Sequence, residues 1–127
     1  MSKVKVGVIG VGRMGKYHVG ILSELPEVEL AAVVDIDSKV RKVLEDNYSA
    51  PGFENYKDIY GKVDAAVVAV PTGLHFSITK DLLNAGIHVL LEKPCAHSLD
   101  HARELFKIAE EKNLTLHIGH VERFNGA

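Results

Sequence analysis

The sequence predicts an α/β chain built around a doubly wound, mostly parallel six-stranded sheet. Short runs rich in β-branched residues alternate along the chain with longer stretches in which apolar residues recur every three or four positions. This alternation is typical of strand–helix units that pack around a parallel sheet. One run, 64–70, is apolar at every position after its first, as expected for a central strand covered by helices on both faces.

Strands and helices account for most of the chain. We expect strands at 4–9, 30–34, 64–70, 87–91 and 114–118, with a short element near Phe53. Apolar spacing predicts helices that begin near 14, 38, 72 and 98, and a single helical turn at 57–60. Helix caps are expected at Ser38, Thr72 and Ser98, and left-handed or glycine stops at Gly86 and Asn113.

Composition limits the size of the fold and the class of its partners. The 127 residues carry a formal net charge of −2, and 46% of them are hydrophobic, which suffices for one domain with one core. Near-zero charge without a Lys/Arg run argues against binding to nucleic acid or to a membrane surface, so we expect a small molecule or a protein as partner. No apolar run approaches the roughly 20 residues that span a membrane. The single cysteine, Cys95, cannot form an internal disulfide and is interpreted as a small core residue, which predicts a cytoplasmic protein.

The first strand leads directly into a glycine-rich motif, Gly10-Val11-Gly12-Arg13-Met14-Gly15, at the start of the first helix. In G-x-G-x-x-G the first glycine permits a tight turn, the second lets the backbone approach a pyrophosphate, and the third lets helix and strand pack closely. The helix N-terminus offers N–H groups to the anion. Asp35 ends the second strand about 20 residues after the motif, where a carboxylate accepts hydrogen bonds from ribose hydroxyls. Together they predict a Rossmann-like NAD(P)-binding domain; the alternative is a glycine-rich turn with a solvated aspartate.

The residues after the second strand bear on the choice of cofactor. An acid at position 35 repels a 2′-phosphate, and Ile36 rather than an arginine follows it, so the sequence favours NAD. Lys39 and Arg41 keep NADP possible, because either side chain can reach toward a phosphate. Their alternative interpretation is that of exposed charges on a helix.

Ligands of open α/β sheets bind beyond the carboxyl ends of the strands. The predicted strand at 64–70 is followed by Pro71, Thr72 and His75. The predicted strand at 87–91 is followed by Glu92-Lys93-Pro94. Lys93 is the candidate for stabilising charge at a substrate hydroxyl as hydride leaves, oriented by Glu92; the alternative is a solvated lysine. His75 is a candidate contact for substrate or nicotinamide ribose, or else a capping or partly buried histidine. Two spaced histidine pairs, 97/101 and 117/120, lack cysteine or carboxylate partners, so no metal site is expected.

Taken in order, these motifs resemble the glucose–fructose oxidoreductase / inositol dehydrogenase / rhizopine catabolism (Gfo/Idh/MocA) family. Glu92-Lys93-Pro94 is the most specific of them, and the ending 119–125 resembles the branch that includes UDP-N-acetylglucosamine 3-dehydrogenases, although Gly126 stands where proline is usual. The resemblance implies NAD(P)-dependent hydride transfer at a sugar, nucleotide-sugar or polyol carbon, with Lys93 as active-site lysine and His75 near the nicotinamide. The implied cofactor-binding residues are Gly10, Gly12, Arg13, Met14, Gly15, Asp35, Pro71, Thr72, Glu92 and Lys93.

Members of that family are similar to this chain over only their first third. Their second domain supplies most substrate contacts and an open sheet through which they assemble, so the resemblance implies a homo-oligomeric full-length protein. We therefore expect 1–120 to be the dinucleotide-binding domain and 121–127 the start of a linker to an absent substrate domain, in a truncated or naturally short chain that is inactive alone. The rival interpretation is a stand-alone dinucleotide-sensing module, which needs Gly10–Gly15 and Asp35 but has no use for Lys93.

Overall fold

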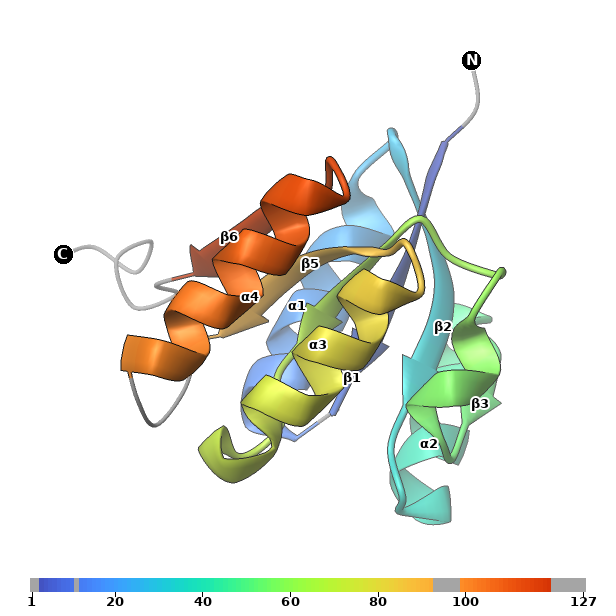
Figure 1. The fold of residues 1–127 in the computed structure, drawn as a ribbon. Coiled ribbons are helices and arrows are strands. Elements are labelled where there is room, and N and C mark those ends of the chain that lie inside the picture. The colour runs from blue at the N-terminus through green and yellow to red at the C-terminus, as the bar shows by residue number, and fades with distance from the viewer. Residues whose placement is uncertain (1–2, 11, 93–98, 120–127) are drawn as a thin grey trace, which may run out of the picture.

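A six-stranded parallel sheet forms the centre of the molecule (Figure 1). The computed structural model describes residues 3–10, 12–92 and 99–119, apart from the side chains of Arg13, Met14, Thr72, Glu92 and Leu99. The strand order is β3-β2-β1-β4-β5-β6, and every neighbouring pair is parallel, which confirms the predicted fold class. The strands are β1 (Val4–Ile9), β2 (Val28–Val34), β3 (Gly52–Phe53), β4 (Ala65–Val68), β5 (His88–Glu92) and β6 (Leu116–Gly119).

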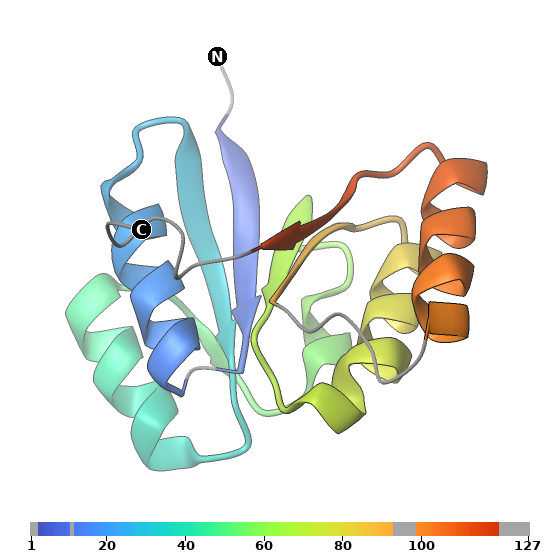
Figure 2. The same cartoon turned by 90° about the vertical axis from the view of Figure 1, so that its left-hand side faces the viewer.

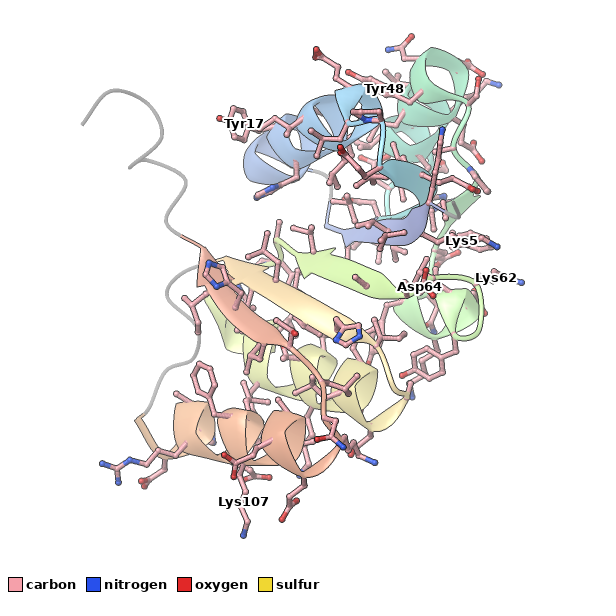
Figure 3. All side chains as sticks on the ribbon, turned by 90° about the horizontal axis from the view of Figure 1, so that it is seen from above. Lys5, Tyr17, Tyr48, Lys62, Asp64 and Lys107 are labelled. Atoms are coloured by element: carbon pink, nitrogen blue, oxygen red, sulfur yellow. The ribbon has the colours of Figure 1, made fainter. Side chains whose placement is uncertain are left out.

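Helices cover the sheet in two layers (Figure 2). The helices are α1 (Arg13–Glu24), α2 (Ser38–Tyr48), α3 (His75–Asn84) and α4 (Leu99–Glu111), with 3₁₀ turns η1 (Tyr56–Ile59) and η2 (Thr72–Leu74). The first two helices lie on one face of the sheet, and α3 and α4 lie on the other. Between each layer and the sheet the side chains form a separate apolar cluster (Figure 3). The predicted short element near Phe53 and the helical turn near 57–60 are both confirmed.

The strand order reverses next to β1, and this reversal positions the site. The chain runs outward from β1 to β3, then crosses over the sheet to place β4 on the other side of β1. Ile9 at the end of β1 is level with Val34 of β2 and with Val68 of β4. The carboxyl ends of three strands therefore meet at one edge, where the connections leave the sheet in opposite directions and open a crevice.

Two expected helix caps are replaced by other residues. Asp37, not Ser38, caps α2: its Oδ1 accepts hydrogen bonds from the N–H groups of Lys39 at 2.9 Å and Val40 at 3.4 Å. Its extended backbone turns the carboxylate back over the free N–H groups of the first turn, whereas Ser38 already has helical geometry. Thr72 begins η2 instead of capping α3, whose N-cap position is Leu74 and has no side-chain cap. Ser98 lies outside the described residues.

The predicted stops of α3 and α4 are confirmed by the backbone. Gly86 has a φ of 84° and Asn113 a φ of 58°, the left-handed conformation that ends a helix. The N–H of Leu114 donates to Ala109 at 2.8 Å and closes the end of α4. The sixth strand therefore begins at Leu116, two residues later than its apolar pattern predicts.

Thr79 of α3 carries a buried hydroxyl that offers a test of the core. Its side chain is 0% exposed, and Oγ1 has no hydrogen-bond partner among the described residues. A buried polar group without a partner costs about 1–3 kcal/mol. Thr79→Val keeps the shape and removes the hydroxyl, so we expect the free energy of unfolding to rise by about 1 kcal/mol in urea denaturation. The exposed Thr115→Val is the control and should change stability little; a loss of stability in Thr79→Val would show that the hydroxyl does find a partner.

Candidate functional site

A cavity of about 870 Å³ opens where the carboxyl ends of β3, β2, β1 and β4 meet. It is lined by the turn after β1, by the end of β2, by the segment after β3 and by the connection from β4 into α3. The lining residues are Ile9, Gly10, Gly12, Val34, Asp35, Ile36, Glu54, Asn55, Tyr56, Ala69, Val70, Pro71, Leu74, Ser77 and Ile78.

Gly10 makes the sharp turn at the floor of this cavity. Its N–H donates to the carbonyl of Val34 at 2.8 Å, and its φ is 84°. A Cβ at this position would lie 2.8 Å from the carbonyl oxygen of Ala69 and 2.9 Å from Cγ1 of Val70. Position 10 therefore requires glycine for two reasons, the left-handed backbone and the close approach of the chain after β4.

Gly12 has space for a side chain, whereas Gly10 does not. It is exposed at the N-cap of α1, and a Cβ built on it would meet nothing within 4 Å. Among the side chains that the structure describes, none caps α1, and the first turn of this helix contains no acidic residue. The free N–H groups at the helix N-terminus, including those of Arg13 and Met14, are therefore accessible to an anion that approaches over Gly12. Gly15 is buried beneath them.

Asp35 lies on the opposite wall, directly after β2. Its Oδ1 accepts a hydrogen bond from the N–H of Asp37 at 2.8 Å, and its backbone N–H donates to Phe53 at 3.0 Å. Arg41 of α2 donates from Nη1 to the backbone carbonyl of Asp35 at 2.6 Å. Arg41 is thus held beside Asp35 by this hydrogen bond, and a fixed cation lies at the end of β2.

The wall formed by Tyr56 and the start of α3 contains one structural contact. Tyr56, at the start of η1, donates its hydroxyl to the Asp81 carboxylate on α3. Burial of the ring and that hydrogen bond both raise the pKa of Tyr56, which keeps the hydroxyl protonated as a donor. Burial also raises the pKa of neighbouring Tyr60. Pro71, Leu74 and Ile78 complete this side. Thr72 lies beside them in η2, and its side chain is outside the described set.

His75 lies beneath this wall. Its side chain is 2% exposed, and Nε2 donates to the carbonyl of Val70 at 2.6 Å. Val70 lines the cavity, whereas His75 is not among its described lining residues. In this structure His75 therefore supports the turn after β4, and its predicted contact with substrate or nicotinamide ribose stays a prediction.

The residues predicted to act on substrate follow β5. That strand ends at Glu92 and is level with β4, with Leu91 paired to Val68, so its carboxyl end lies at the same edge as the cavity. Lys93, Pro94, Cys95 and the residues from 120 onward lie outside the described residues. Their predicted roles stay predictions.

Sequence reasoning missed the segment that closes the cavity beyond Asp35. Glu54, Asn55 and Tyr56 line it, because β3 pairs in parallel with β2 and ends level with it, Phe53 opposite Val34. The available signal was the turn at Pro51-Gly52 before Phe53, which marks a third strand whose carboxyl end must lie at the same edge. Within the described part of the chain there is no cluster of three or more metal-binding side chains, and no helix long and apolar enough to cross a membrane.

The cavity suits a dinucleotide. The uncapped N-terminus of α1 and the open position above Gly12 offer a place for a pyrophosphate, and Asp35 stands one strand away, where a ribose attached to that pyrophosphate would lie. The lining residues beyond these polar groups are mostly apolar, as in pockets that hold flat ring systems.

Comparison with known proteins agrees with this geometry. The chain is 31% identical over 127 residues to UDP-N-acetylglucosamine 3-dehydrogenase of Acidithiobacillus ferrooxidans, a match that covers 100% of this chain and 40% of that protein. It is 34% identical to the rhizopine catabolism protein MocA of Rhizobium meliloti, over 98% of this chain and 39% of that protein. The crystal structure of GenD2 from gentamicin A biosynthesis, in complex with NAD, superposes with a TM-score of 0.90 at 34% identity, over 94% of this chain and 35% of that one.

The chain thus spans about 40% of the length of the curated relatives it matches. The family model described as the oxidoreductase family with an NAD-binding Rossmann fold matches residues 4–120, nearly the whole chain. This range contains the glycine turn, Asp35 and every wall of the cavity. The chain belongs to this Gfo/Idh/MocA oxidoreductase family and covers its NAD-binding domain.

Proposed function

We propose that this chain is the cofactor-binding domain of an NAD(P)-dependent oxidoreductase that transfers hydride between the nicotinamide and a hydroxyl-bearing carbon of a sugar, nucleotide-sugar or polyol. The observation that carries the proposal is the open backbone at Gly12 above the uncapped N-terminus of α1, with Asp35 one strand away. The names of its relatives, which include sugar and inositol dehydrogenases, support the substrate class. Most substrate contacts belong, in this proposal, to a second domain.

Each polar group has its own role in binding the cofactor or in the reaction. The N–H groups at Gly12, Arg13 and Met14 bind the pyrophosphate, and Gly10 and Gly15 shape the turn that presents them. Asp35 binds the adenosine ribose, while Pro71 and Thr72 face the nicotinamide half. When bound, NAD supplies the hydride acceptor for alcohol oxidation. Lys93 takes up the charge or proton at the substrate hydroxyl, and Glu92 orients it.

The choice between NAD and NADP tests the role of Asp35. We expect Asp35→Ser to weaken NAD binding about tenfold, because ribose hydroxyls lose a charged acceptor. We expect the same variant to bind NADP more tightly than the parent does, because Arg41 is already beside position 35 and a repelling carboxylate is gone. Isothermal titration of both dinucleotides measures the two affinities.

The control for that experiment is Asp46→Asn, which makes the same change in charge on the exposed side of α2. It should leave the ratio of NAD to NADP affinity at the parent value. An unchanged NAD affinity in Asp35→Ser would contradict the assignment of Asp35 to the ribose.

A further inference from the structure

The order of the strands sets the direction in which a dinucleotide lies in the cavity. The cavity runs across the ends of β3, β2, β1 and β4. In the proposed function, on which this inference rests, the pyrophosphate binds at α1 after β1 and the ribose binds Asp35 after β2. The adenine base, attached to that ribose, must then continue outward to the end of β3. The nicotinamide half must run the other way, toward β4.

Three residues occupy the place where the base arrives. Glu54, Asn55 and Tyr56 line the cavity directly after β3. The backbone N–H of Asp35 donates to the carbonyl oxygen of Phe53 at 3.0 Å. Glu54, the next residue, therefore lies beside the position proposed for the ribose. Ile36 also lines the cavity, and its side chain is 84% exposed. It offers an apolar surface for one face of a planar ring.

Two of the three polar side chains already have internal partners. Asn55 Oδ1 accepts from the N–H of Lys57 at 2.9 Å and caps η1, and the Tyr56 hydroxyl donates to Asp81. Glu54 differs, because within the described part of the chain its carboxylate makes no hydrogen bond and no ion pair. Of the described side chains in this segment, Glu54 is therefore the one whose acceptor atoms are all available to a ligand.

We propose that Glu54 reads the base of the cofactor by accepting a hydrogen bond from the exocyclic amine of adenine. An ionised carboxylate only accepts hydrogen bonds, so it is complementary to that amine, which donates. A purine with a carbonyl oxygen at the same ring position presents a second acceptor there, so this hydrogen bond is lost. Glu54 is thus a specificity-determining residue, and it selects an adenine dinucleotide over a hypoxanthine one.

Nicotinamide hypoxanthine dinucleotide tests this assignment, because it differs from NAD in the base alone. In calorimetric titrations we expect the parent chain to bind NAD about tenfold more tightly than this analogue, the effect of about one hydrogen bond to a charged group. Glu54→Gln should lose that preference, because the side-chain amide can donate to the carbonyl of hypoxanthine. Glu111→Gln makes the same charge change at the exposed end of α4 and should keep the parent preference.

The outcomes separate this inference from the function on which it rests. If the parent binds both dinucleotides equally, or if Glu54→Gln keeps the full parent preference, the role of Glu54 is overturned while NAD binding stands. If the parent binds neither dinucleotide, the proposed function falls and the role of Glu54 falls with it. Thermal unfolding of each variant checks that the fold is intact; Glu54 is exposed and follows the last residue of β3, so no loss of folding is expected.

Discussion

Replacing Gly10 by alanine is expected to lower the free energy of unfolding by about 3 kcal/mol. A non-glycine residue at a φ of 84° is strained by about 1–3 kcal/mol. The added methyl group would also lie 2.8 Å from the Ala69 carbonyl, a contact that only movement of the β1 or β4 connection can relieve. Urea denaturation followed by circular dichroism measures the loss.

Gly12→Ala is the matched control for this variant. It adds the same methyl group two residues later, at a negative φ and with nothing within 4 Å, so stability should fall by less than about 1 kcal/mol. In the proposed function the two glycines therefore separate folding from binding, because a methyl group at position 12 would block the proposed position of the pyrophosphate. Equal losses of stability in the two variants would contradict this division.

Lys93→Met is expected to lower turnover of the full-length protein by about 10²- to 10⁴-fold, the usual contribution of a positioned acid–base group. NAD affinity should change far less, because the proposed contacts to the pyrophosphate and the ribose follow other strands, β1 and β2. Steady-state rates with a panel of sugars, nucleotide-sugars and polyols, together with a direct NAD titration, measure the two effects separately.

Lys107→Met controls for loss of a lysine in general. Lys107 projects from the outer side of α4, away from the sheet (Figure 3), so its replacement should leave turnover at the parent value. Two results would contradict the role of Lys93: full activity in Lys93→Met, or loss of NAD binding in step with turnover. A parent protein that binds NAD but oxidises no member of the panel would favour the dinucleotide-sensing module.

Apolar periodicity and glycine spacing predicted the sheet, its doubly wound order and the turn between β1 and α1. They succeeded because Gly10 and Asp35 directly follow strands and Gly12 directly precedes a helix, positions where local sequence determines backbone geometry. The wall at 54–56 was missed because β3 is only two residues long and has no periodicity to detect. The cap at Asp37 and the fixed position of Arg41 depend on side-chain contacts around a turn, which spacing along the chain does not reveal.

The proposed function depends most on the binding of NAD in the crevice above Gly12. Isothermal titration of NAD into this chain, and into its Gly12→Ala variant, tests this binding directly. We expect one NAD to bind per parent chain, and at least about tenfold weaker binding to the variant, a loss of roughly 1.4 kcal/mol. Failure of the parent chain to bind NAD, or equal affinity in a stably folded Gly12→Ala chain, would contradict it.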